Sequence, residues 1–101
     1  MKIAVATEQQ DVNAEISRNF GRSAYFLIFD ADGNLLDMIS NAPPSHARGA
    51  GHRAAKILKD LGVTHVIAGH FGPEAEADLG DAGIEIFKHA GRANNAVREL
   101  H

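Results

Sequence analysis

Residues 63–73 read Val-Thr-His-Val-Ile-Ala-Gly-His-Phe-Gly-Pro, and this stretch decides the fold that the sequence predicts. Its first part, Val63 to Ala68, is apolar and rich in β-branched residues, which is typical of a buried strand. The glycines then indicate a turn, and Pro73 suits the first position of a helix because no N–H is needed there. The stretch therefore predicts a strand–turn–helix unit of an α/β protein.

The remaining elements follow from hydrophobic runs, which predict strands, and from apolar stripes at helical spacing, which predict helices. The sequence Ala-Asp-Gly-Asn at 31–34 predicts a turn that joins two antiparallel strands. Residues 8–23 are mostly polar and read as a long loop. The expected strands are Ile3–Thr7, Ala24–Asp30, Leu35–Ser40, Val63–Ala68 and Ile84–Phe87, and the expected helices are Ala47–Leu61, Pro73 to about Ala82, and Gly91–Leu100.

A hairpin that leads into β-α-β units predicts an α/β protein with a mixed five-stranded sheet and helices packed on it. Right-handed crossovers give the strand order 3-2-1-4-5, with strands numbered along the chain. This arrangement is a ribonuclease H-like three-layer fold. No linker or repeat divides the sequence, so we expect a single domain over residues 1–101.

Composition excludes several classes of protein. The chain has 10 basic and 13 acidic residues, a net charge of −3, and therefore no basic footprint for nucleic acid. It has no cysteine, which excludes disulfides and iron–sulfur clusters held by its own thiolates. Because the sequence lacks a secretory signal and an apolar run of about 18 residues, we expect a cytoplasmic protein without a membrane partner.

The fold predicts where a ligand binds. In open α/β sheets ligands lie at the carboxyl ends of the strands where the winding direction changes, here between the first and fourth strands. Thr7 ends the first strand, and Gly69, His70 and Gly72 follow the fourth. Glycines let a backbone approach a ligand closely, and the following helix N-terminus favours an anion, to which Arg22 and Arg48 add positive charge. The alternative is that Gly69 and Gly72 only form a tight turn.

The six histidines include two candidate metal ligands, His46 and His70, which lie in the predicted site loops. His52 lies on the polar face of a predicted helix, His65 lies inside a strand, and His89 follows a strand. No histidine spacing of a preformed zinc site is present, and a structural role is the alternative for each of them.

Nothing in the sequence indicates an enzyme. Ser17, Ser23 and Ser45 lack the nucleophile-elbow pattern and read as caps and loop residues. A two-metal nuclease needs clustered carboxylates, usually with one in the first strand, and Ile3–Thr7 contains none. We therefore expect no catalytic residues.

Several linked segments resemble a known family. They are residues 1–6, the stretch Ser17-Arg18-Asn19-Phe20-Gly21-Arg22-Ser23-Ala24-Tyr25-Phe26, and the short segments Gly49-Ala50-Gly51, Gly62-Val63, Val66-Ile67-Ala68-Gly69, Gly72-Pro73 and Ala82-Gly83-Ile84. Their order and spacing, over nearly the whole chain, resemble the dinitrogenase iron–molybdenum cofactor biosynthesis family, which includes NifX-like proteins and the C-terminal part of NifB.

The resemblance implies a binding or carrier protein for the iron–molybdenum cofactor, another metal–sulfur cluster, or a precursor. Characterised members of the family bind such clusters, and some hold a molybdenum–copper sulfide cluster. Together with the position of the predicted cleft, it gives the cofactor-binding residues Thr7, Asn19, Phe20, Gly21, Arg22, Gly49, Gly51, Gly69, His70 and Gly72, and the metal ligands His46 and His70.

One position departs from the family pattern. The family often has histidine immediately before Phe-Gly, where this chain has Asn19. Because an asparagine amide is a poor ligand for soft metals, either His46 or His70 replaces it, or backbone N–H groups and Arg22 hold the cluster without direct ligation.

Three functions stay open at this point. The first is a carrier whose partners are a metal–sulfur cluster and cofactor-biosynthesis proteins, acting as a monomer or homodimer. The second is an enzyme acting on a small anionic substrate. The third is a protein-interaction module that uses an exposed edge strand.

Overall fold

The computed structural model describes residues 1–41 and 50–100. Within these ranges the chain forms five strands and three helices, in the predicted order. None of these helices is both long and apolar enough to cross a membrane. The elements are β1 (Lys2–Thr7), β2 (Tyr25–Asp30), β3 (Leu35–Ser40), α1 (Ala50–Asp60), β4 (His65–Ala68), α2 (Pro73–Asp81), β5 (Glu85–Lys88) and α3 (Ala93–Glu99).

The five strands form one mixed sheet in the order β3-β2-β1-β4-β5, which confirms the predicted order. The central strand β1 pairs antiparallel with β2 and parallel with β4, and Val5 lies opposite both Leu27 and Ile67. The hairpin partner β3 and the last strand β5 form the two edges. The sheet is therefore antiparallel from β3 to β1 and parallel from β1 to β5.

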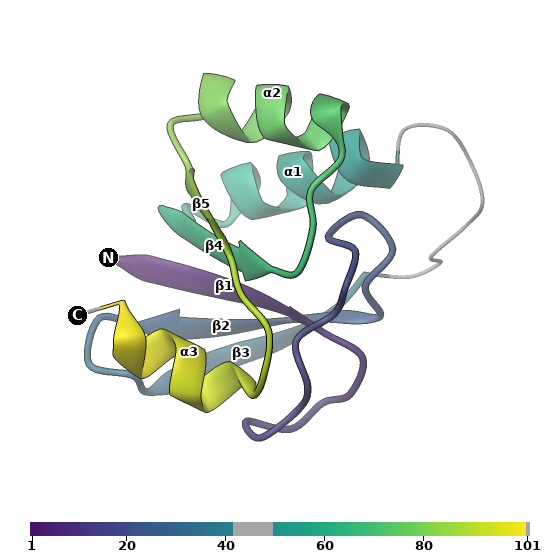
Figure 1. Ribbon diagram of the computed structural model, residues 1–101. Coiled ribbons are helices and arrows are strands. Elements are labelled where there is room, and N and C mark those ends of the chain that lie inside the picture. The colour runs from purple at the N-terminus through teal and green to yellow at the C-terminus, as the bar shows by residue number, and fades with distance from the viewer. Residues whose placement is uncertain (42–49, 101) are drawn as a thin grey trace.

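Helices cover both faces of the sheet, as Figure 1 shows, with α1 and α2 on one face and α3 on the other. Successive side chains of a strand point to opposite faces, so the two cores share the same strands. The first core joins sheet residues such as Ala4, Ile28 and Val66 to Ala54, Leu58 and Leu79 of the paired helices. The second joins sheet residues such as Val5, Leu27 and Ile67 to Ala93, Ala96 and Val97 of α3.

Some element boundaries differ from the prediction. Helix α3 begins at Ala93 rather than Gly91, because Gly91 has φ of 111° and Arg92 is extended and pairs with Glu15. Strand β4 begins at His65, two residues later than predicted. Helix α1 ends at Asp60, and the predicted positions 47–49, together with the predicted cap Ser45, lie outside the described residues.

The hairpin turn between β2 and β3 is held by one carboxylate. Oδ1 of Asp30 accepts hydrogen bonds from the backbone N–H groups of Asp32 and Asn34, each at 2.9 Å, and Oδ2 accepts one from the Asn34 side chain at 3.2 Å. These bonds, with that from the Asn34 backbone foremost, lower the pKa of the Asp30 carboxyl.

We expect the Asp30 carboxyl to titrate below the usual aspartate range in an NMR titration of the folded protein. Because its pKa is lower in the folded state than in the unfolded state, the carboxylate contributes stability above the unfolded pKa. That contribution is lost as the pH falls through the folded pKa. In Asp30→Asn the Asn34 amide resonance should stop responding to acid, and an unchanged response would assign the titration to another group.

The edge strand β3 carries two exposed apolar side chains, Leu36 at 53% and Met38 at 40% exposure. The Asn41 N–H donates to the Ala24 carbonyl, so the alternation of an antiparallel pair turns the Met38 N–H away from β2. That N–H donates to Oδ1 of Asp37 at 2.8 Å. The outward donor of Met38 is therefore already bonded within its own strand.

Candidate functional site

The carboxyl edge of the sheet is crossed by residues 14–20, which we call the crossing segment. The Ser17 N–H donates to the carbonyl of Ala6 in β1 at 2.7 Å, and the Ser17 carbonyl accepts from the Gly69 N–H after β4 at 2.8 Å. The Phe20 N–H donates to the His70 carbonyl at 2.9 Å. The chain itself therefore fills the seam between β1 and β4, where the sequence predicts a ligand cleft.

Glycine at position 69 is required by this crossing. A Cβ atom at Gly69 would lie 3.0 Å from Cα of Arg18 and 3.2 Å from the carbonyl oxygens of Ser17 and Arg18. All three atoms belong to a backbone that is hydrogen-bonded on both sides, so they cannot easily move away. The close approach that the glycine permits is thus to the protein's own backbone.

The crossing segment is anchored in the core by Phe20. Its side chain is fully buried, with ring centroids 5.2 Å from Phe71 and 5.3 Å from Phe26. Offset and tilted arrangements at these distances are favourable for aromatic pairs. Phe20 therefore fixes the position of the exposed residues that precede and follow it, Asn19 and Arg22.

A hollow of about 380 Å³ opens beside the crossing segment, and we call it the arginine hollow. Three arginines and two glutamates contribute to its wall, so positive charge is in excess. The lining residues are Glu8, Gln9, Glu15, Ile16, Ser17, Arg18, Asn19, Arg22 and Arg92.

Two of these arginines have no partner among the described residues. Within residues 1–41 and 50–100, the guanidinium groups of Arg18 and Arg22 make no hydrogen bond and no ion pair. Arg92 donates only to the Asn13 carbonyl at 3.2 Å, while the Glu8 carboxylate accepts from the Ala24 N–H at 2.9 Å. The arginine hollow therefore presents positive hydrogen-bond donors that the fold does not use, which suits an anion.

A second hollow of about 550 Å³ lies on the other side of Arg18, against the ends of β4 and β5. Its lysine is already paired, because Nζ of Lys88 lies 3.4 Å from Oε1 of Glu76, and Nε2 of His89 lies 2.8 Å from Oε2 of Glu99. Gly69 lines this second hollow. Arg18 is the one arginine in its wall, so it is a weaker candidate for an anion than the arginine hollow, which has three.

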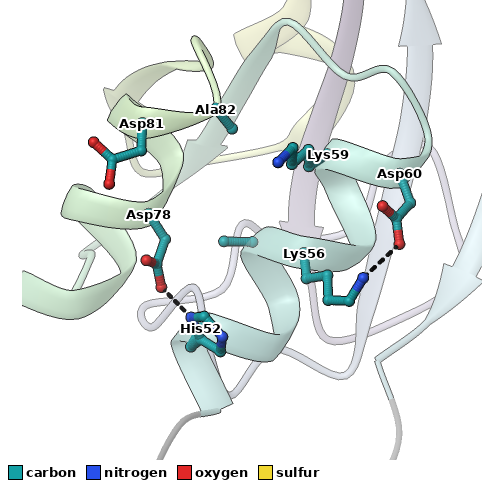
Figure 2. A pocket seen from close by; sticks show the side chains of 8 residues that line it. His52, Lys56, Lys59, Asp60, Asp78, Asp81 and Ala82 are labelled. Carbon is teal, nitrogen blue, oxygen red and sulfur yellow. Dashed lines mark hydrogen bonds and ion pairs between the residues drawn. The ribbon is translucent and has the colours of Figure 1, made fainter.

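A third hollow, of about 270 Å³, lies between α1 and α2 (Figure 2). The figure shows His52 turned toward Asp78 and Lys56 turned toward Asp60. Nδ1 of His52 lies 2.6 Å from Oδ2 of Asp78, and Nζ of Lys56 lies 3.4 Å from Oδ2 of Asp60. Because most of these side chains satisfy one another, this groove reads as the crossing of two helices. Gly51 belongs to the same crossing, since a Cβ there would lie 3.1 Å from Cβ of Ala75.

The structure brings two of the predicted site residues together, Asn19 and Arg22, which both line the arginine hollow. His70 is exposed and lines neither this hollow nor the second one, although its carbonyl bonds to the crossing segment. Gly72 is the N-cap of α2. The predicted residues His46 and Gly49 lie outside the described residues.

The other predicted site residues serve the fold. Thr7 is buried and its hydroxyl donates to the Gln9 carbonyl at 2.8 Å. Gly21 is buried, and its carbonyl accepts from the Asn41 side chain at 3.3 Å. Phe20 belongs to the aromatic cluster. None of these residues lines the arginine hollow, the second hollow, or the groove between α1 and α2.

Direct metal ligation finds no support in the described part of the chain. Among residues 1–41 and 50–100, no three His, Asp or Glu side chains lie close enough to hold a metal ion together. Within these ranges, the polar groups of the arginine hollow can offer a guest positive charge and hydrogen bonds.

Seven of the nine lining residues were not expected as site residues from the sequence, and the polar ones that matter most for an anion are Ser17, Arg18 and Arg92. Arg92 reaches the hollow because Gly91 and Arg92 pair with the crossing segment, through the bridge between Glu15 and Arg92. Residues so far apart along the chain leave no local signal of this pairing. The only sequence cue is the Gly-Arg pair that follows the last strand.

Known proteins resemble this chain in sequence and in structure. A protein of Methanocaldococcus jannaschii, MJ0580, is 28% identical over 91 residues, which are 87% of this chain and 74% of that protein. The apo form of the orange protein from Desulfovibrio gigas has a TM-score of 0.91 and 29% identity, over 98% of this chain and 85% of that chain. A putative NifB protein from Thermotoga has a TM-score of 0.84 and 27% identity, with the same two coverages.

The pattern of one protein family matches the whole chain. That family is described as dinitrogenase iron-molybdenum cofactor, and the match spans residues 1–101. The match agrees with the resemblance carried by the segments around Ser17–Phe26 and Val66–Gly69. The chain belongs to the dinitrogenase iron–molybdenum cofactor family.

Proposed function

We propose that this protein binds and carries an anionic metal–sulfur cluster, the iron–molybdenum cofactor or a precursor of it, and that it is not an enzyme. The observation that carries the proposal is the pair of unpartnered guanidinium groups, Arg18 and Arg22, in the arginine hollow. The cluster is cargo, and the partners are proteins that build or receive it. The match to a cofactor family and the likeness to a putative NifB protein support this.

The arginine hollow has the chemistry for holding such a cargo without covalent bonds. A guanidinium group is planar, always charged and weakly hydrated, so it gives up water readily to a large anion. The Asn19 amide adds donors beside it. With no cysteine in the sequence, the sulfide ligands of the cluster must come with the cargo.

Three finer expectations from the sequence belong to the same proposal. They are a ribonuclease H-like fold, a cytoplasmic location, and action as a monomer or homodimer. The predicted ligands His46 and His70 would take part only where a metal of the cluster is open to direct ligation.

The test uses tetrathiomolybdate with copper(I) as the probe, under anaerobic conditions. We expect the protein to retain molybdenum through desalting and to show charge-transfer absorption. Arg18→Ala combined with Arg22→Ala should weaken retention by about a hundredfold, taking about tenfold for each charge-assisted contact. With Arg18 kept, Arg22→Lys should bind the probe less tightly than the unaltered protein and more tightly than Arg22→Ala, because lysine keeps the charge and loses the planar fork.

A matched control removes the same number of charges elsewhere. Lys56→Ala combined with Arg98→Ala takes away two cations outside the arginine hollow, on α1 and α3. This control should bind the probe like the unaltered protein at about 0.15 M salt, where distant charges are screened. Equal losses in the two double variants would show general attraction, and no retention by the unaltered protein would reject the proposed function.

A further inference from the structure

The hydroxyl of Ser17 is buried and has no hydrogen-bond partner in the part of the chain that the structure describes, although buried hydroxyl groups usually have one. The residue is only 2% exposed, and among residues 1–41 and 50–100 its Oγ is the single buried side-chain nitrogen or oxygen that makes no hydrogen bond. An unsatisfied buried polar group costs free energy, so each one in a native structure requires an explanation.

The other buried hydroxyls near this edge are satisfied. Ser23 donates to the Phe20 carbonyl at 3.1 Å, and Thr7 donates to the Gln9 carbonyl at 2.8 Å. Backbone carbonyls in and near the crossing segment, those of Phe20 and Gln9, therefore accept from buried hydroxyl groups, and Ser17 uses none. This contrast indicates that the Ser17 hydroxyl is available to donate a hydrogen bond to a bound ligand.

The location of Ser17 indicates what that is. Ser17 lines the arginine hollow between Ile16 and Arg18. Its backbone is fixed on both sides, by the bond to Ala6 and the bond from Gly69. Its Oγ is buried, so a rotation about χ1 is needed to turn the hydroxyl toward a guest, and this rotation leaves the backbone in place.

We propose that the arginine hollow accepts a tetrahedral oxyanion of the molybdate type, and that the Ser17 hydroxyl donates a hydrogen bond to one of its oxygens. Arg18 and Arg22 neutralise the charge. Oxygen is a strong acceptor of an O–H donor and sulfur is a weak one, so Ser17 favours an oxo group over a sulfido group. The inference deepens the proposed function at the same site, since it gives the hollow an oxygen-bearing precursor as ligand.

The experiment titrates the protein with molybdate, and separately with tetrathiomolybdate, by calorimetry and by NMR. We expect Ser17→Ala to weaken molybdate binding about tenfold and tetrathiomolybdate binding about threefold or less, with thermal stability unchanged or raised. Ser23→Ala, which removes a buried hydroxyl that has a partner, should lose stability without this selective loss of molybdate affinity. In the unaltered protein, molybdate should shift the amide resonances of Ser17 and Arg18.

The outcomes separate the two proposals. If tetrathiomolybdate binds and molybdate does not, or if Ser17→Ala binds molybdate as tightly as the unaltered protein, the inference about Ser17 is overturned and the carrier function stands. If molybdate binds with the expected loss in Ser17→Ala and the unaltered protein does not retain molybdenum from tetrathiomolybdate with copper(I), the inference stands and the cluster-carrier proposal fails. If neither molybdate nor the probe with copper(I) is bound, both are overturned.

Discussion

Replacing Phe20 by alanine is expected to lower the free energy of unfolding by about 3–5 kcal/mol, the usual cost of removing a fully buried aromatic ring. The ring of Phe20 is 0% exposed and touches the rings of Phe26 and Phe71. Its loss would leave a cavity under the crossing segment. A loss of this size is a large part of the stability of a small domain, so the variant should be near the limit of folding.

Equilibrium denaturation in urea, followed by circular dichroism, measures the Phe20 effect. Phe20→Leu keeps much of the apolar volume and should lose clearly less stability than Phe20→Ala. The neighbouring substitution Asn19→Ala removes an exposed side chain and should change stability by no more than about 0.5 kcal/mol. A loss below about 1 kcal/mol in Phe20→Ala would mean that Phe20 does not anchor the crossing segment.

Replacing Gly69 by alanine is expected to cost about 2 kcal/mol, within the range for forcing an extra methyl group into a packed site. The new Cβ would lie 3.0 Å from Cα of Arg18, so either the crossing segment or the end of β4 must shift. For a domain of this size the melting temperature should fall by roughly 8–16 °C. Because Ser17 and Arg18 move with the segment, anion binding should also weaken.

Gly80→Ala is the matched control for the change at Gly69. Gly80 lies in α2, and a Cβ added there would have no atom within 4 Å, so alanine should leave stability unchanged or raise it slightly. Differential scanning calorimetry on both variants gives the comparison. Similar melting temperatures for Gly69→Ala and the unaltered protein would show that the crossing segment adjusts without cost, against the close packing described above.

Much of the fold could be predicted because its signals are local. Val63–Ala68 and Ile3–Thr7 are continuous apolar runs, and the apolar stripe of α3, including Ala93, Ala96 and Val97, is buried as its spacing indicates. The turn chemistry of Asp32 and Gly33 favours the hairpin, and Gly33 has φ of 86°. These features depend on neighbours in sequence, so one sequence is enough to predict them.

The candidate site was predicted less completely because its geometry depends on contacts between distant segments. The sequence indicates a ligand at the seam between β1 and β4, and it could not show that residues 14–20 bond to Ala6 and Gly69 and close that seam. It did indicate Asn19 and Arg22, which share the arginine hollow. Arg92 arrives through pairing with Glu15, and that pairing has no local pattern.

The Asp37–Met38 hydrogen bond at the free edge of β3 has a consequence for how copies of this protein behave at high concentration. An open edge strand with apolar side chains such as Leu36 is a template on which a second chain can add a strand and begin to aggregate. Here an incoming strand would have to displace the Asp37 carboxylate from the Met38 N–H. The displaced negative charge would then lie beside the backbone of the incoming strand. We therefore expect Asp37 to disfavour the addition of a second chain at the edge where exposed Leu36 and Met38 would favour it.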